Sequence, residues 1–309
     1  MTRKKIAKKK LLYVCLIICF IIMLFASNYF VMHMTSDYHL KEDSLTNYSY
    51  KNEVYFALDK KSKSNIWGKS QIGGWAFCTS NSQNENRLLT FLFKSPNQTY
   101  SLQTTYLIDR QAVLDDYKKI GIVMTNPIIG YDRDFSTINM KQGIYQLYVY
   151  CYENEQDYGL TKTNYFFEKK GTSFAPYEWK SKIVEAKTVV TPNENAVAIL
   201  DVAKIKGECL ELTGWAIIQG EDSSNQVVYA KVTGNGLGKT FNTLDYRRIS
   251  IADAYSDERY ADCGYTALIP LDNIDNGLLT VEIIVENNGQ IGVSKTYTIR
   301  KDSSSVEIV

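Results

Sequence analysis

The feature that most constrains this fold is a tripeptide that the chain uses twice. Gly74-Trp75-Ala76 recurs as Gly214-Trp215-Ala216. Further shared landmarks surround each copy in the same order: an Asp after an apolar run (Asp59, Asp201), an Arg (Arg110, Arg248), a Gly-Tyr pair (Gly130-Tyr131, Gly264-Tyr265) and a later Gly before a strand-like run (Gly143, Gly277). A fixed order with length changes confined to the gaps is what duplication leaves when loops vary and the core does not. We therefore predict one module used twice.

The landmarks set the domain boundaries. We predict a first repeat at residues 54–168 and a second at 197–301. Residues 169–196, with two prolines and many Lys, Ser and Thr, are expected to be a linker, and 302–309 a C-terminal tail. Repeats of this length suit ordinary globular domains better than solenoid units.

Each repeat consists of short runs rich in β-branched and aromatic residues and bounded by turn residues. In residues 278–285 apolar and polar side chains alternate, which gives the strand one apolar face. Short strands at regular spacing with one buried face predict an all-β sandwich. Only Arg110–Lys119 and Ile249–Tyr255 are expected to form short helical turns.

The N-terminus predicts a membrane anchor. Residues 1–10 carry six positive charges, and no charge follows from Leu11 to Met32. Such a run is long enough to span the ~30 Å hydrocarbon core of a bilayer. We predict a transmembrane signal-anchor helix at 11–33 with the basic tail in the cytoplasm and everything after it outside, beginning with a stem at 34–53. The alternative is a signal peptide cleaved before Ser27.

Composition excludes several function classes. Without the basic tail the remaining residues carry +1 − 6 = −5, and they form no dense basic patch, so nucleic acid is not an expected partner. The two histidines, His33 and His39, both precede the repeats. Serine-histidine, cysteine-histidine and histidine-ligated zinc chemistry are therefore not expected within them. We predict no metal and no cofactor.

Three motifs invite a chemical interpretation, and each is better explained as a turn or a strand. Residues 233–240 resemble a phosphate loop, but Thr233 replaces its first glycine and a strand follows, so a hairpin turn is predicted. Asp132-Arg-Asp134 has the spacing of a metal motif, yet the second repeat has no counterpart. Residues 272–277 read as an acidic turn with a minor possibility of calcium.

The two tryptophans and two arginines are given structural roles. We expect Trp75 and Trp215 to lie across the sandwich cores, because the small residues beside each indole leave room for it. Arg110 and Arg248 each precede an Asp by five residues, and we expect them to pair with that Asp or to hold a loop.

Six cysteines divide into two groups. Cys15 and Cys19 lie in the apolar run and are interpreted as small hydrophobic residues. The other four permit three disulfide connectivities: Cys78, Cys151, Cys209 and Cys263. A Cys78–Cys151 bridge is plausible because both side chains share a face with core residues, and Cys209–Cys263 follows by elimination. Free buried thiols are the alternative.

A contrast between the repeats marks a candidate binding surface. Tyr148, Tyr150 and Tyr152 alternate onto one face of their strand, whereas the aligned residues of the second repeat are Glu282, Ile284 and Glu286. Tyrosine offers rigid apolar area with a polar tip, which suits contact with protein or glycan. The alternative is packing against neighbouring strands or against the second repeat.

The Gly-Trp-Ala, Arg, Gly-Tyr and late-Gly landmarks resemble the immunoglobulin-like sandwich modules of bacterial cell-surface and envelope-glycan proteins. The resemblance implies two tandem immunoglobulin-like domains after one N-terminal transmembrane helix, and it transfers no catalytic residue. The Cys…Trp…Cys order of antibody domains is absent.

We interpret the chain as a membrane-anchored, extracellular binding or adhesion protein that recognises envelope glycan or a protein partner. The alternative is a non-catalytic accessory subunit of an envelope polysaccharide assembly complex. The third hypothesis is a hydrolase that uses a carboxylate pair, and it is the weakest because duplicated small sandwiches are a poor scaffold for one.

Overall fold

The chain forms two compact units. The first contains residues 1–160 and 167–177, and the second contains residues 161–166 and 178–309. The computed structural model describes residues 13–27, 39–65, 68–78, 87–123, 126–185, 194–235, 237–303 and 305–309. We call the unit built on strands β1–β10 module 1 and the unit built on β11–β21 module 2. Strands dominate both units, which confirms the all-β prediction.

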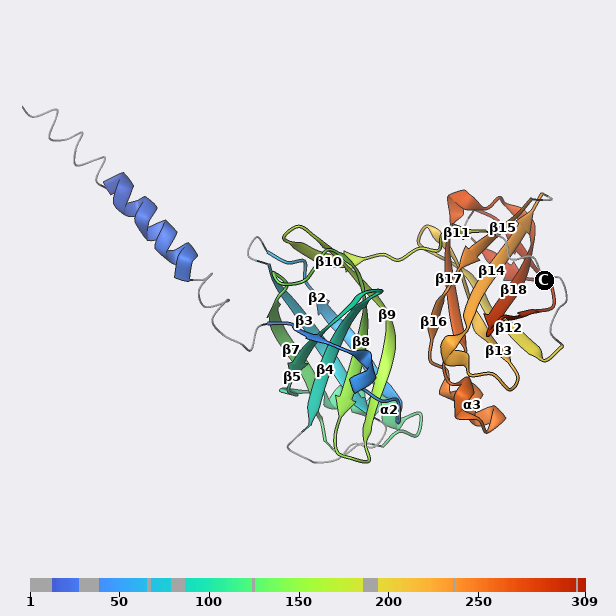
Figure 1. Ribbon diagram of the computed structural model, residues 1–309, viewed down its shortest axis with the longest axis horizontal. Helices are drawn as coiled ribbons and strands as arrows, with labels where there is room; N and C mark the ends of the chain where they lie inside the picture. Colours follow the sequence, from blue (N-terminus) through green and yellow to red (C-terminus); the bar gives the residue numbers. More distant parts are fainter. Residues whose placement is uncertain are drawn as a thin grey trace, which may run out of the picture. The chain divides into compact units, whose positions relative to one another are not determined.

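Module 1 is a sandwich of two sheets (Figure 1). Its elements are β1 (Lys41–Asp43), η2 (Leu45–Asn47), β2 (Val54–Lys61), β3 (Lys69–Cys78), β4 (Leu88–Ser95), β5 (Gln98–Thr104), β6 (Ile108–Asp109), α2 (Gln111–Lys118), β7 (Ile128–Ser136), β8 (Gly143–Tyr152), β9 (Tyr158–Lys170) and β10 (Ser173–Tyr177). The larger sheet has the order β1-β5-β4-β8-β9-β10 and the smaller the order β2-β3-β7-β6.

Module 2 repeats this plan. Its elements are β11 (Ile183–Val184), β12 (Ala196–Lys206), β13 (Cys209–Ile218), η3 (Ser223–Asn225), β14 (Val227–Gly234), β15 (Leu237–Asn242), β16 (Leu244–Tyr246), α3 (Ile249–Tyr255), η4 (Glu258–Tyr260), β17 (Gly264–Pro270), η5 (Leu271–Asn273), β18 (Gly277–Asn287), β19 (Gln290–Val293), β20 (Tyr297–Lys301) and β21 (Val306–Ile308). The sheets run β11-β15-β14-β18-β20-β21 and β12-β13-β17-β16, and β19 pairs with β18.

The two modules match in register as well as in strand order. Trp75 lies opposite Gly130, and Trp215 lies opposite Gly264. The first strand of each small sheet is interrupted by a bulge at the landmark aspartate, Asp59 or Asp201. The predicted helical turns are confirmed as α2 and α3, which occupy the same place in the chain order of each module.

The structure moves three of the predicted boundaries. The expected stem contains β1, which pairs with β5 of module 1, so much of that segment belongs to the sandwich. The expected linker contains β10 and β11, one in a sheet of each module, and its residues 186–193 lie outside the described residues. The expected tail contains β21, which pairs with β20. Short edge strands with mixed polarity give no periodic signal, so the sequence did not reveal them.

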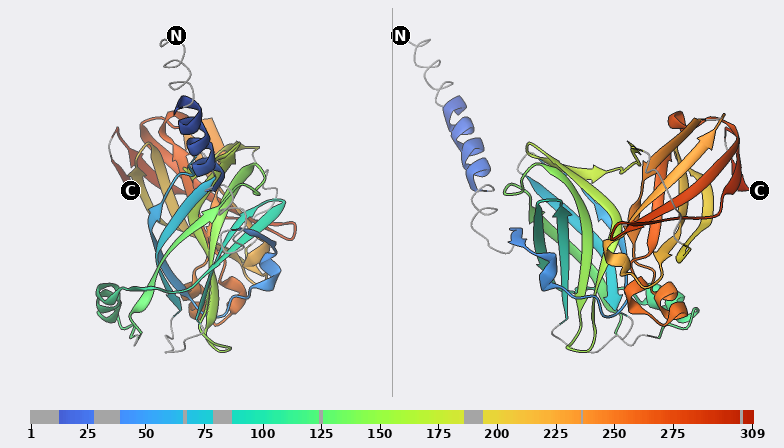
Figure 2. Two further views of the ribbon diagram at one scale, coloured as in Figure 1. Left: turned by 90° about the vertical axis from the view of Figure 1, so that its left-hand side faces the viewer. Right: turned by 45° about the vertical axis from the view of Figure 1, so that its right-hand side comes forward.

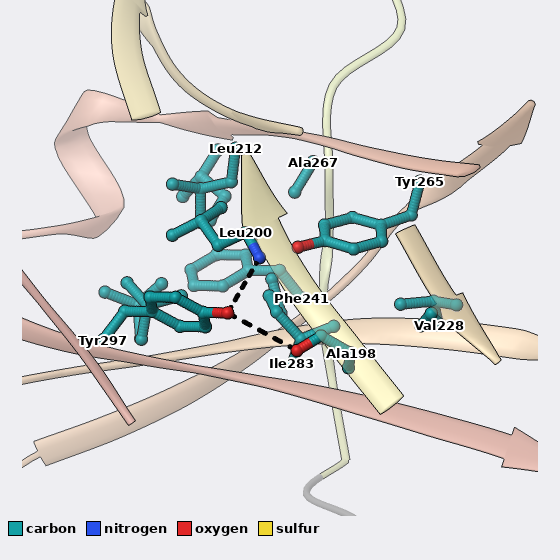
Figure 3. Packing of buried hydrophobic residues seen from close by; sticks show 14 of the residues in the cluster. Ala198, Leu200, Leu212, Val228, Phe241, Tyr265, Ala267, Ile283 and Tyr297 are labelled. Atoms are coloured by element: carbon teal, nitrogen blue, oxygen red, sulfur yellow. Dashed lines mark hydrogen bonds between the residues drawn. The ribbon is translucent and has the colours of Figure 1, made fainter. Parts of the chain in front are cut away.

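The core of module 2 lies between its two sheets, where the inward side chains of both interdigitate (Figure 3). Phe241 comes from the larger sheet and Tyr265 from the smaller one, and both are fully buried. The Tyr297 hydroxyl donates to the Ala198 carbonyl oxygen at 3.4 Å and accepts from the Leu200 amide at 3.1 Å. A hydroxyl placed in an apolar core needs such partners to offset the cost of its desolvation.

The glycine of each Gly-Trp-Ala is required by a tyrosine that crosses the core side of the small sheet. The Tyr131 hydroxyl donates to the Ala57 carbonyl oxygen at 3.2 Å, and Tyr265 donates to Ile199 at 2.9 Å. A Cβ at Gly74 would overlap the Ala57 carbonyl oxygen, and one at Gly214 would meet the equivalent oxygen of Ile199. The shared Gly, Tyr and bulge are thus one packing unit built twice.

The prediction that the tryptophans lie across the sandwich cores is wrong. Ala76 and Ala216 point into the cores and are fully buried, whereas Trp75 and Trp215 are half-buried on the outer face of their strands. Trp75 packs against Tyr117 of α2, and Trp215 against Tyr255 of α3. The small residues make room for the crossing tyrosines rather than for the indoles. Strand alternation separates two faces but does not say which one is inward.

The landmark arginines are structural, but their partners are not the expected ones. Arg110 Nη2 pairs with Asp59 Oδ2 at 2.8 Å, and Arg248 pairs with Asp201. Each arginine lies immediately before the helix of its module, so the pair ties the helix to the bulge of the first strand. Of the two predicted roles, the structure shows no pair with the Asp five residues later; each arginine instead holds the bulge beside its helix.

Residues 13–27 of the predicted anchor are helical with exposed side chains. Residues 11–12 and 28–33 of that prediction, together with the basic tail, lie outside the described residues. Among the described residues no helix combines the length and the apolar character needed to cross a membrane.

Candidate functional site

The tyrosine stripe of β8 lies on the outer face of the larger sheet of module 1. Leu147, Val149 and Cys151 point into the core and are fully buried. The three tyrosines between and beyond them take the opposite face, where Tyr148 lies beside Leu92 of β4 and Tyr150 beside Thr90. Tyr148 is only 4% exposed, whereas Tyr150 and Tyr152 are half-buried. The stripe therefore has a covered end and an open end.

The cover is the segment 40–52, which we call the strap. It crosses the outer face of the larger sheet before the chain enters β2 (Figure 1). Leu45 and Tyr48 of the strap pack on a small cluster made by Leu92, Tyr148, Tyr150 and Leu160. The rings of Tyr48 and Tyr150 meet edge to face with centroids 4.8 Å apart. The predicted stem thus supplies part of the surface that the stripe was expected to form alone.

Asp43 fastens the strap. Its carboxylate accepts hydrogen bonds from the Tyr48 hydroxyl at 2.7 Å, from Asn47 Nδ2 at 2.8 Å and from the Ser44 amide at 2.8 Å. Burial alone would raise the pKa of Asp43, but these bonds and one from Ser101 hold it below its ordinary value. Burial, and then the bond to Asp43, raises the pKa of Tyr48. The carboxylate is therefore ionised and the phenol neutral at physiological pH.

The other end of the strap is fastened to β9 through the backbone. The Asn52 amide donates to the Tyr158 carbonyl oxygen at 3.0 Å. The chains pass so closely that a Cβ at Gly159 would overlap the Asn52 carbonyl oxygen. Beside this crossing the Lys51 ammonium lies 5.2 Å from the centre of the Tyr158 ring.

We call the surface formed by Tyr48, Tyr150, Tyr152 and Tyr158 the tyrosine face. These side chains are half-buried, so each ring is held by packing while part of it stays accessible. Sequence reasoning found the two tyrosines on β8. It missed Tyr48, because the strap was assigned to a stem, and Tyr158, which begins the next strand. Alternation along the strand revealed the first two, and no local signal marks the others.

The described residues of module 2 form no equivalent surface. At the matching positions of β18, Glu282 pairs with Lys231 at 2.7 Å and Ile284 is 2% exposed. Glu286 lies beside Ile291 of β19, and Ile291 takes the place that Tyr158 has in module 1. The tyrosine face therefore belongs to module 1 alone, although both modules share the sheet that carries it.

The four cysteines of the modules are free, buried thiols. Cys78 of β3 and Cys151 of β8 face each other across the sandwich, with Cys78 Sγ 3.6 Å from the Cys151 carbonyl oxygen. Module 2 has Ile218 and Val285 at the same positions, both buried, so the thiols take the place of an ordinary core contact. The hydrogen bond with the Cys151 side chain, and then burial, raise the pKa of Cys78.

The prediction of a Cys209–Cys263 disulfide is wrong. Cys209 lies opposite Pro270, at one end of β13, whereas Trp215 lies opposite Gly264, the residue after Cys263. In this register Cys263 lies level with Ala216, and seven residues of strand at ~3.3 Å each place the two cysteines ~23 Å apart. A disulfide requires Cα atoms within about 7 Å. The prediction by elimination assumed that each of the four cysteines forms a disulfide, whereas Cys209 and Cys263 are free thiols.

A buried ion pair at one end of module 1 was not anticipated. Arg87, just before β4, pairs with Glu153, just after β8, at 2.9 Å, and both are almost completely buried. The guanidinium also donates to the Ile128 carbonyl oxygen at 2.8 Å and stacks 4.2 Å from the centre of the Tyr106 ring. Residues outside the strands carry no periodic signal, so sequence reasoning had no means of pairing them.

The motifs that invited a chemical interpretation are accounted for by structure. Asp132 of β7 accepts from Gln71 of the neighbouring β3 at 2.7 Å and from Lys60 of β2, one strand further, at 2.6 Å. The Gly-rich segment forms the β14–β15 hairpin, as predicted. Its Lys239 donates to the Asn273 carbonyl oxygen of the acidic turn at 2.7 Å, beside a hollow of about 70 Å³. In the described part of the chain no cluster of His, Cys, Asp or Glu has the makings of a metal site.

Comparison of the sequence with models of known protein families and with curated proteins gives no match.

Proposed function

We propose that this chain is a non-catalytic binding protein with two immunoglobulin-like domains, held at a membrane by residues 11–33 with both domains outside the cell. The domain assignment is supported by strand order. The small sheet of module 1, β2-β3-β7-β6, corresponds to A-B-E-D of such domains, and β5-β4-β8-β9 corresponds to C′-C-F-G. The anchor assignment is supported by the uncharged run that follows six positive charges.

The ligand that we propose is an envelope glycan, bound at the tyrosine face. The observation that carries this is the arrangement of Tyr48 and Tyr150, whose edge-to-face packing holds the rings rigidly beside a hydrogen-bonded carboxylate. Sugars present C–H faces together with hydroxyls, and aromatic rings with polar tips match both. A flat protein contact needs a continuous apolar core to its interface, whereas each of these half-buried rings exposes only part of its area.

The perturbed titrating groups support binding in preference to catalysis. The largest pKa shifts belong to tyrosine and cysteine side chains, and burial is the leading cause of those in module 2, as at Tyr265 and Cys263. Such groups are held neutral by packing. An acid or base in catalysis needs a pKa near the working pH and access to a substrate.

The test is binding of the full chain to a panel of soluble bacterial cell-wall polysaccharides. Tyr152→Ser removes a ring that the strap does not cover and is expected to weaken binding at least tenfold, while the melting temperature stays near that of the parent. Tyr229→Ser is the matched control, since Tyr229 is a half-buried, outward tyrosine of module 2. Its affinity should equal that of the parent. Equal binding by the Tyr152→Ser chain, or binding only to a protein, would refute the proposal.

A further inference from the structure

Module 1 exposes a second surface around α2, with side chains that come from just before β6, from the end of α2 onward and from the first residue of β7. Four large aliphatic side chains stand in solvent there: Leu107, Ile120, Val123 and Ile128, with exposed fractions of 69%, 70%, 67% and 44%. We call this the α2 surface. Figure 2 shows α2, in teal-green, at the outer margin of the module. Large aliphatic side chains that one segment leaves in solvent mark a candidate contact site.

The fold does not require these aliphatic side chains. Ile108 and Tyr246 occupy matching places opposite Gly130 and Gly264, so Leu107 corresponds to Asp245. By the same register Ile128 corresponds to Asp262. The loop that carries Ile120 and Val123 is replaced by residues 256–261, where Arg259 pairs with Asp257 at 2.7 Å. In the segment around α3, module 2 therefore has charged side chains at the positions where the segment around α2 exposes apolar ones.

Ring packing and backbone hydrogen bonds hold the α2 surface in place. Tyr117 on the inner side of α2 packs between Trp75 and Phe77, with ring centroids 5.6 and 5.1 Å away. The Arg110 amide donates to the Pro127 carbonyl oxygen at 2.8 Å, which joins the residue before α2 to the residue before β7. The Ile122 amide donates to the Tyr117 carbonyl oxygen at 3.1 Å, which fixes the turn after α2. A surface held in this way loses little conformational freedom on binding.

Charges on α2 indicate what the surface binds. The exposed charges of α2 and its C-cap are acidic at Asp115 and Asp116 and basic at Lys118 and Lys119, and the exposed Asp109 adds one more acid, so the surface carries no net positive charge. An anionic membrane would favour a net positive surface, which this is not. If two copies of α2 lie antiparallel about a two-fold axis, the acids of each meet the lysines of the other. Such self-complementarity is what an isologous interface requires.

We propose that the α2 surface binds a second copy of this chain, with the four aliphatic side chains at the centre and the charges of α2 crossed between copies. The intramolecular pair of Asp116 and Lys119 is more than 70% exposed on each side, and an exposed pair is easily exchanged for an equivalent one. The dimer is independent of the glycan proposal, because the tyrosine face lies on the other sheet.

Charge reversal tests the proposal. The purified full chain in detergent is expected to have the mass of a dimer by light scattering, after the detergent is subtracted. Asp115→Lys with Asp116→Lys makes the face wholly basic, and Lys118→Asp with Lys119→Asp makes it wholly acidic. Each variant alone is expected to raise the dimer dissociation constant at least tenfold, and mixing the two should restore a heterodimer. A monomeric parent, an unaffected variant or a mixture that stays monomeric would overturn the proposal.

A second experiment tests the apolar centre without relying on charge. Leu107→Asp with Ile128→Asp introduces the residues that module 2 carries at these places, so folding should persist and the dimer should be lost. Leu278→Asp is the control, because Leu278 is 61% exposed in module 2. A photo-reactive phenylalanine at position 120 of the membrane-embedded full chain should give a cross-linked product of two chains. A product with lipid or with another protein would contradict the dimer.

Discussion

At the scale of single residues, the landmarks of the repeat have different physical reasons. The glycine before each tryptophan leaves space for a carbonyl oxygen and a crossing tyrosine, and the aspartate occupies a bulge where an arginine holds it. The alanine faces the core, and the tryptophan covers the outer face. None of these roles can be exchanged for another residue type without rebuilding its neighbours, which explains why both copies retain them.

Gly74→Ala is expected to destabilise module 1 by about 3 kcal/mol or more, because the new methyl group overlaps backbone that cannot move away. The control is Gly73→Ala on the same strand, whose Cβ would have its nearest neighbours at 3.4 Å and which should cost under ~1 kcal/mol. Urea unfolding of both chains measures the difference. Similar losses for the two would show that the crossing tyrosine does not constrain the strand.

Cys263 is expected to make stability fall in alkaline solution. Burial raises its pKa to about 12 against an ordinary value of 9.0. A raised pKa favours the neutral thiol in the folded state, so this stability is complete below about pH 9 and is lost as pH rises toward 12. The free energy of unfolding of Cys263→Ala should therefore fall less steeply over that range than that of the parent. Parallel curves would mean that the thiol is not desolvated.

At the scale of elements, duplication predicted most of the fold. The order and spacing of landmarks located both sandwiches and both short helices, because the same core pattern is written twice. Three things escaped prediction: the face on which Trp75 lies, the strap over β8, and the buried pair of Arg87 and Glu153. Each depends on which segment covers a surface, and alternation along a strand carries no information about that. The candidate site was therefore half predictable, on β8 alone.

The buried pair of Arg87 and Glu153 is expected to be replaceable by the residues that module 2 has at these positions, provided that both are replaced together. Where module 1 has Arg87 and Glu153, module 2 has Gln226 and Asn287, which are buried and bonded to the Ala216 and Asp222 carbonyl oxygens. Glu153→Asn alone leaves a buried guanidinium without its counter-charge and should cost about 3–5 kcal/mol. Adding Arg87→Gln should recover most of that loss. A double-mutant cycle by urea unfolding measures it, and additive losses would contradict the account.

At the scale of the whole molecule, one framework carries two different surfaces. The modules share strand order, bulge and helix, whereas within the described residues the tyrosine face and the α2 surface are found in module 1. At matching positions module 2 has ion pairs such as Lys231 with Glu282 and Arg259 with Asp257. The glycan and dimer proposals therefore both place recognition in module 1.

Hydrogen–deuterium exchange of the full chain, with and without a bound cell-wall polysaccharide, tests this placement of recognition most directly. The account predicts slower exchange in the strap, residues 40–52, and in β8, residues 143–152, with no change in β18, residues 277–287. The strap should respond because its backbone bonds to β5 and β9 close one side of the binding surface. Protection confined to β18, or cleavage of the polysaccharide during the measurement, would contradict it.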